Sequence, residues 1–376
     1  MKLICSKANL LQGVNIVSKA VPSKTTMTIL ECILIDASTN EIKFTANDME
    51  LGIETKVDGD IIEKGIIALD AKIFSEIVRK LPDNDVVIET DENYVTLITC
   101  EKAKFTIVGK SGEDFSYLPM IEKSSSFTIS QFTLKEVIKQ TIFSIADNDN
   151  NKMMTGELFE ISGNQLKVVA LDGHRIAIRK IELNDMFQES SAMNEPQKVI
   201  VPGKTLNEIS KILSGEAENM VSIFFTDKHI LFEFDNTTVV SRLIEGSYFK
   251  IDQMLSNDYA TKVRINKKEL LSCIDRATLL IKEGDKKPII MNVTDGSMEL
   301  KMNSVVGSMN ETIDIVKDGK DILIGFNPKF LIDALRIIDD EEINIYLVNP
   351  KAPCFIRDEE SKYTYLILPV NFNTVS

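Results

Sequence analysis

The sequence predicts an α+β fold in which three similar domains follow one another, each built from two βαβββ units. One order of strand, helix and three strands recurs along the 376 residues. The strand-length segments are short and separated by turn residues, as in antiparallel hairpins. Three helix starts also align Lys72, Lys204 and Lys329, in ALDAKIFSEIVRKL, VPGKTLNEISKIL and FNPKFLIDALRII. Their spacings of 132 and 125 residues indicate whole domains rather than solenoid turns.

The first two units occupy about the first 110 residues. KLIC is a short strand, and apolar residues at helical spacing then predict a helix over 7–20 that ends before Pro22. Three strand-length segments rich in branched residues follow, ILECILID, EIKFTAND and LGIETKV. The same order returns in GIIALD, a helix over 70–81, and the segments DVVIET, YVTLIT and KFTIVG.

Four further units complete the chain, with predicted helices at 133–146, 204–213, 267–282 and 328–338. Turn-rich segments at 120–126 and 255–260 are candidate linkers. We therefore expect domains at 1–122, 123–256 and 257–376. In each unit one amphipathic helix should cover one face of an antiparallel sheet.

Composition narrows the function classes. Charged residues make up 27% and hydrophobic ones 44%, as in soluble globular proteins. No apolar run approaches the ~18 residues of a membrane span, and MKLICSKANLL lacks the pattern of a secretory signal, so we expect a cytoplasmic protein with no membrane partner. The five cysteines show no CxxC spacing, which favours buried free thiols and predicts neither a disulfide framework, a metal site nor a cofactor.

Charge is unevenly distributed along the chain. A net charge of −14 argues against a nucleic-acid partner at first sight. The six predicted helices nevertheless hold 15 Lys or Arg against 7 Asp or Glu, while the remainder is strongly acidic. Two interpretations remain open. The helices have ordinary solvated faces, or they line one basic surface that attracts DNA while the rest repels it.

The segment VVALDGHRIAIRK places His174 beside Asp172 and Arg175, as an active-site fragment would. Asp-Gly between two strand-like runs predicts a hairpin turn in which Gly173 takes a positive φ. A hydrolase built on Asp172 and His174 is an alternative, but no nucleophile motif accompanies them and His229 offers no paired metal ligand. VGKSG lacks the first glycine of a phosphate loop, since residue 104 is lysine. We therefore expect no enzyme.

The C-terminal run YTYLILPVNF is continuously apolar up to Pro369. A core strand with Leu366 and Leu368 on one face is its simplest interpretation. Because Pro369 interrupts the hydrogen-bond ladder, Val370 and Phe372 are candidates for the wall of a partner groove.

Four motifs, ALDGHRIAI, EGSYF, FNPKFLIDAL and the terminal LPV, together with the threefold repeat, resemble the bacterial DNA polymerase III beta subunits, the replicative sliding clamps, over essentially the whole chain. The resemblance implies the DNA clamp fold. Two subunits join head to tail into a homodimeric ring with antiparallel sheets outside and helices inside, and duplex DNA passes through without being read in sequence. Such a ring is a processivity factor with no catalytic site. The alternative is a monomeric repeat scaffold that binds protein partners only.

The resemblance also implies three sets of site residues. A groove would receive short peptides of the replicative polymerase alpha subunit, the clamp loader and repair proteins. Its residues are Met154, Leu171, Gly173, His174, Arg175, Ile176, Phe249, Met254, Asn327, Phe330, Leu366, Ile367, Leu368, Pro369 and Val370. The DNA-facing residues are Lys24, Lys72, Lys135, Lys139, Lys204, Lys267 and Lys329. Phe105 and Ile107 of one subunit would meet Leu279 and Leu280 of the other.

Several positions depart from the family pattern. They are Thr28 and Phe249 in place of Pro, Asn151, Gln253 and Asn371 in place of Arg, Leu171 in place of Thr, and the extra tail 373–376. These changes predict a groove that is less basic than usual and has its own peptide preference.

Overall fold

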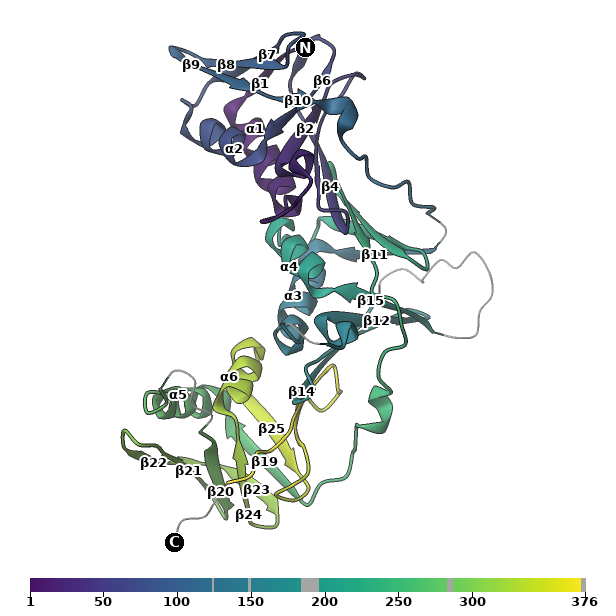
Figure 1. The fold of residues 1–376 in the computed structure, drawn as a ribbon. Coiled ribbons are helices and arrows are strands. Elements are labelled where there is room, and N and C mark those ends of the chain that lie inside the picture. The colour runs from purple at the N-terminus through teal and green to yellow at the C-terminus, as the bar shows by residue number, and fades with distance from the viewer. Residues whose placement is uncertain (124, 148–149, 184–195, 283–286, 373–376) are drawn as a thin grey trace. The chain divides into compact units, whose positions relative to one another are not determined.

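The computed structural model describes residues 1–123, 125–147, 150–183, 196–282 and 287–372. The chain forms two compact units. Unit 1 comprises residues 1–135, 184–194 and 204–243, and unit 2 comprises 136–183, 195–203 and 244–376. The division passes through the predicted middle domain because each unit contains a nine-stranded sheet that includes part of it. Figure 1 shows the course of the chain.

Within the described residues, six α-helices overlap the six predicted ranges. They are α1 (Lys7–Val17), α2 (Ala71–Lys80), α3 (Gln131–Thr141), α4 (Gly203–Ile212), α5 (Lys267–Thr278) and α6 (Pro328–Ile337). Helices α3 and α4 begin slightly earlier than predicted. Side-chain oxygens cap several of them: Ser6, Asp70 and Asn327 each accept a hydrogen bond from a backbone N–H in the first turn. The predicted ranges 7–20 and 133–146 were longer because 3-10 turns follow α1 and α3, η1 (Ser18–Ala20) and η4 (Ile142–Ser144).

Unit 1 contains two sheets, of five and nine strands. The five-stranded sheet has the order β5 (Asp60–Glu63), β1 (Lys2–Ser6), β7 (Asp85–Thr90), β8 (Val95–Cys100) and β9 (Ala103–Val108). The nine-stranded sheet has the order β10 (Lys110–Ser111), β6 (Ile66–Asp70), β2 (Cys32–Asp36), β3 (Ile42–Asn47), β4 (Leu51–Val57), β18 (Thr237–Arg242), β17 (His229–Phe234), β16 (Met220–Phe225) and β11 (Ser125–Ser130). Helices α1 and α2 pack side by side (Figure 1), α1 against β1, β3 and β4 and α2 against β2 and β6.

Unit 2 contains sheets of nine and four strands. The nine-stranded sheet has the order β15 (Gln197–Pro202), β12 (Gly156–Ser162), β13 (Gln165–Leu171), β14 (Arg175–Glu182), β27 (Tyr363–Ile367), β26 (Cys354–Arg357), β25 (Glu342–Leu347), β19 (Thr261–Asn266) and β23 (Val316–Gly319). The four-stranded sheet has the order β22 (Ser308–Asp314), β21 (Ser297–Asn303), β20 (Ile289–Thr294) and β24 (Ile322–Phe326). Helix α5 packs on β21, β22 and β19, and α6 on α5 and β27.

The described strand pairs are antiparallel, which confirms the α+β prediction. Two details were wrong. Strand β5 was not predicted, because it is a short, mostly exposed edge strand without apolar alternation. The predicted strand ILECILID begins only at Cys32, since its first residues form the 3-10 turn η2 (Thr28–Glu31).

The cysteine side chains are placed as the sequence predicts. All five cysteines are free and buried, as predicted, and burial raises the pKa of the Cys354 thiol to about 12. In the part of the chain that the structure describes, no helix has the length and apolar character needed to cross a membrane.

Candidate functional site

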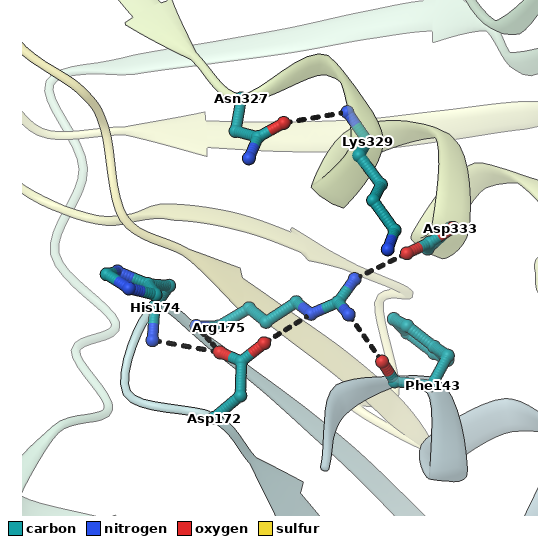
Figure 2. A network of polar contacts seen from close by, with 7 residues as sticks. All are labelled: Phe143, Asp172, His174, Arg175, Asn327, Lys329 and Asp333. Carbon is teal, nitrogen blue, oxygen red and sulfur yellow. Dashed lines mark hydrogen bonds and ion pairs between the residues drawn. The ribbon is translucent and has the colours of Figure 1, made fainter. Parts of the chain in front are cut away.

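The turn between β13 and β14 is the predicted Asp-Gly hairpin. Gly173 has φ +83°, which a residue with a side chain rarely adopts. The Asp172 Oδ1 atom accepts hydrogen bonds from the backbone N–H groups of His174, at 2.9 Å, and Arg175, at 3.1 Å (Figure 2). This carboxylate therefore fixes the turn, and His174 projects from its rim.

Arg175 points away from that rim and is almost fully buried, with 7% of its surface exposed. Its Nε donates to Asp172 at 3.0 Å, its Nη1 to Asp333 on α6 at 2.7 Å, and its Nη2 to the carbonyl of Phe143 on η4 at 2.5 Å (Figure 2). The guanidinium also lies 4.6 Å from the ring centroid of Phe330 and 5.2 Å from that of Phe143. Arg175 thus ties three elements together, and its charge is already matched by two carboxylates.

His174 has the surroundings of a recognition residue. Its ring stacks on Phe330, with centroids 5.9 Å apart and an interplanar angle of 21°. The neighbouring carboxylate of Asp172 is occupied by the backbone and by Arg175. A general base needs an orienting partner and a nucleophile within hydrogen-bond reach, and this geometry supplies an aromatic wall instead.

A cavity of about 400 Å³ opens beside this turn, which is a typical volume for a ligand site. We call it the groove. It is lined by Met154, Leu171, Gly173, His174, Arg175, Ile176, Phe249, Met254, Pro353, Leu366 and Leu368. Ten of these residues belong to the predicted set, and Pro353 was missed. Its floor is a buried cluster that includes Leu171, Ile176 and Leu366. The structure therefore brings together an apolar, concave surface from segments far apart in sequence.

The other predicted groove residues lie elsewhere. The ring of Phe330 stacks on that of His174. Asn327 caps α6, where its Oδ1 accepts a hydrogen bond from the N–H of Lys329 (Figure 2). Pro369 and Val370 are not among the lining residues, and the N–H of Val370 donates to the carbonyl of Gly325. Ile367 was wrongly assigned to the groove. Neighbouring strand residues face opposite sides of a sheet, so with Leu366 in the groove floor, Ile367 packs into the other core.

The predicted DNA-facing lysines fall into two groups. Lys24, Lys72 and Lys329 are exposed, and their ammonium groups form no ion pair with a described residue. The other four are engaged: Lys135 with the carbonyl of Leu213, Lys267 with that of Ile338, Lys139 with Glu136 and Lys204 with Asp48. These partners were not predictable because helix periodicity says nothing about which acceptors a flexible lysine reaches.

The residues predicted to join two subunits include exposed apolar side chains. Phe105 is 39% exposed on β9, at the edge of the five-stranded sheet. In unit 2, Leu279 is 81% exposed just after α5, the helix that packs on the edge strand β22. Ile107 is half-buried, and Leu280 packs against the core of unit 2. Apolar groups beside open sheet edges are features that a monomer usually avoids.

Comparison with known proteins identifies the family. Models of the DNA polymerase III beta subunit match residues 1–119 with the N-terminal domain, 128–250 with the central domain and 252–371 with the C-terminal domain. The beta sliding clamp of Bacillus subtilis is 35% identical, covering 98% of this chain and 99% of its own length, and that of Staphylococcus aureus is 34% identical, covering 94% of each.

Solved structures agree over the same length. A crystal structure of a putative DNA polymerase III beta subunit from Eubacterium rectale is 74% identical, with a TM-score of 0.95, over 99% of this chain and 100% of that one. The Bacillus subtilis clamp structure has 34% identity and a TM-score of 0.94, with the same coverage. On this evidence the chain belongs to the DNA polymerase III beta subunit family, the beta sliding clamps.

Proposed function

We propose that the chain acts as a DNA sliding clamp. Two copies close head to tail into a ring around duplex DNA and tether the replicative polymerase, and the chain is an accessory subunit without catalytic activity of its own. The observation that carries this proposal is the full-length similarity to beta sliding clamps in both sequence and fold. The domain boundaries follow the repeat, at 1–122, 123–256 and 257–376, and the site of action is the cytoplasm.

The proposed hold on DNA is topological and aided by weak, long-range attraction. Lys24, Lys72 and Lys329 have free ammonium groups for phosphates, while the lysines engaged with carbonyls and carboxylates exchange partners when DNA is present. Phosphate contacts carry no sequence information, and they weaken at higher salt because the release of counterions from DNA then gains less free energy. Such contacts retain the ring on DNA without stopping its movement.

The groove is the proposed docking site for short peptides of the polymerase alpha subunit, the clamp loader and repair proteins. Its apolar floor suits two or three apolar anchors of an extended peptide, and His174, whose ring stacks on Phe330, forms one wall. Because Arg175 is saturated by Asp172 and Asp333, the groove selects for shape and apolar character rather than for charge.

The ring is tested by small-angle scattering and by retention on DNA. We expect the mass of two chains and the pair-distance profile of a hollow particle, and retention on closed circular DNA that is lost when the circle is cut. The double variant Lys72→Glu with Lys329→Glu should lower retention more at low than at high salt, because salt screens the attraction that the lysines supply, and it should leave the dimer intact. A compact monomer that still binds partner peptides would support the protein-only scaffold instead.

A further inference from the structure

A second cavity adjoins the groove and has no part in the function proposed above. It has a volume of about 550 Å³. Its base is formed by β12, β13 and β15, with Leu158, Glu160, Lys167, Lys198 and Ile200, and the segment 246–253 covers it. We call it the linker pocket, because that segment leads into the candidate linker at 255–260.

The linker pocket and the groove are neighbours separated by one aromatic side chain. Phe249 lines both cavities, and its ring packs edge to face on Tyr248, with centroids 5.7 Å apart at 81°. The Tyr248 hydroxyl donates to the carbonyl of Val169 at 3.3 Å, which holds this part of the linker against β13. A peptide chain that leaves the groove past Phe249 therefore enters the linker pocket without crossing another element.

The charges of the linker pocket differ from those of the groove. Lys167 is largely buried and binds Asp252 at 2.9 Å and Glu160 at 3.5 Å. Lys198 lies 3.4 Å from the same Glu160 but is 52% exposed, and Lys250 is exposed without an ion pair to any described residue. Three ammonium groups thus face two carboxylates, and the two solvent-facing ones are available to a ligand.

The positive potential acts on the one exposed carboxylate of the pocket. The hydrogen bond from Lys167 and the charges of Lys167, Lys198 and Lys180 lower the pKa of Asp252. An incoming carboxylate meets the same field. It can pair with Lys198 or Lys250 while the buried contact between Lys167 and Asp252 stays intact.

We propose that the linker pocket receives an acidic segment flanking the apolar anchors of the peptide that occupies the groove. The inference rests on the proposed peptide-binding function of the groove, and it adds the chemical class of the flanking residues. The linker pocket, rather than the groove, binds the negative charge of the peptide, because the guanidinium of Arg175 beside the groove is already paired with Asp172 and Asp333.

Fluorescence anisotropy with labelled synthetic peptides tests the proposal on the full-length protein. One peptide carries only apolar anchors, Leu and Phe, and the others add three aspartates or three serines at either end. We expect aspartates at one end to tighten binding about fivefold over serines at the same end, the size of two exposed ion pairs, and the gain to shrink with salt. A nonspecific charge effect has the opposite sign, since the protein carries a net charge of −14.

Two double variants locate the effect. Lys198→Ala with Lys250→Ala should abolish the gain from aspartate and leave the anchor-only peptide unchanged. Lys64→Ala with Lys320→Ala removes the same charge from exposed positions outside the pocket and should preserve the gain. Equal affinity of aspartate and serine peptides at both ends, or a gain that survives the first double variant, would overturn the inference. Failure of the anchor-only peptide to bind would instead overturn the groove assignment.

Discussion

The two nine-stranded sheets contain the same turn in two chemical versions. In unit 1, Asp48 Oδ1 accepts hydrogen bonds from the N–H groups of Glu50, at 3.0 Å, and Leu51, at 2.7 Å, as Asp172 does from its second and third followers in unit 2. The residue after each aspartate is left-handed, Met49 with φ +75° and Gly173 with φ +83°. The backbone conformation of the turn beside the groove therefore occurs twice in the protein.

Only one of these turns borders an open groove, because side chains at matching register positions differ. The cavity beside Asp48 measures about 90 Å³, against 400 Å³ beside Asp172. Gly52 in unit 1 occupies the position that Ile176 occupies in unit 2. Gly52 pairs with Val240, and Ile176 pairs with Leu366. Leu118, in the segment that leads into the first candidate linker at 120–126, fills the space above Gly52, where an added Cβ would lie 2.0 Å from its Cδ2. A groove therefore forms in unit 2, where the strand contributes the apolar side chain of Ile176 to the floor and no described linker side chain such as Leu118 fills the space above it.

The largest test of this comparison is Arg175→Ala. Removing the guanidinium takes from the carboxylates of Asp172 and Asp333 the cation that they share, which should cost ~3–5 kcal/mol in unit 2 and abolish peptide binding. Denaturant unfolding and anisotropy measure both effects. The control is Arg242→Ala, an exposed arginine beside the turn of unit 1, which should change stability by less than ~0.5 kcal/mol. Similar small effects of the two variants would show that Arg175 is not a structural tie.

The second test is Leu118→Ala. This change should enlarge the small cavity of unit 1 and destabilise that unit by ~1–2 kcal/mol, below the usual range for a buried leucine because Leu118 is half-buried. Denaturant unfolding measures the loss. Met120→Ala, a fully exposed neighbour in the same linker, serves as the control and should be neutral. If both variants behave alike, the linker does not close this cavity.

Local signals explain how much could be predicted from the sequence. Helix positions follow from apolar spacing and capping residues, and the hairpin at Gly173 follows from Asp-Gly between two strands, so both were confirmed. Groove residues came from the family resemblance, which included Ile367, whereas the alternation of the strand already placed only Leu366 and Leu368 on one face.

What escaped prediction depends on long-range register. Pro353 reaches the groove because β26 pairs with β27, which places it opposite Leu368, and no periodicity signals this. Arg175 looked like a recognition residue until Asp333, 158 residues away, and the carbonyl of Phe143 were seen to occupy it. The filling of one cavity by Leu118 likewise depends on a linker whose path has no local signature.

A third test concerns one position inside the two sheets. Glu157 and Ile33 occupy equivalent positions in the two sheets. Glu157 comes directly after Gly156, which pairs with Pro202 just before α4. Ile33 comes directly after Cys32, which pairs with Asp70 just before α2. Both side chains are fully buried, and no described residue forms a hydrogen bond of normal geometry with a carboxyl oxygen of Glu157. Burial, opposed only by the nearby Thr141 hydroxyl, raises the pKa of Glu157 well above 4.5. Glu157 therefore stays protonated in the folded protein at pH values where the unfolded chain ionises.

Stability should accordingly fall as pH rises from about 4.5 toward the raised pKa, since only the unfolded state releases this proton. Glu157→Gln removes the titration. We expect the variant to exceed the parent protein by ~1 kcal/mol at pH 8 and the difference to vanish near pH 4, as measured by denaturant unfolding at a series of pH values. A difference independent of pH would mean that ionisation of Glu157 is not the cause.

The smallest effect distinguishes the two turns themselves. Met49 is 55% exposed, so the burial of its side chain does little to offset the strain of its left-handed backbone conformation. Gly173 adopts the same conformation at no steric cost. Met49→Gly should therefore stabilise unit 1 by ~0.5 kcal/mol, because relief of backbone strain outweighs the added freedom of the unfolded chain. Gly173→Ala should destabilise unit 2 by about the same amount, although no atom lies within 4 Å of the added Cβ. Denaturant unfolding measures both changes. Backbone strain predicts that the two variants change stability with opposite signs. Side-chain packing alone predicts no change for Gly173→Ala and a small loss of stability for Met49→Gly.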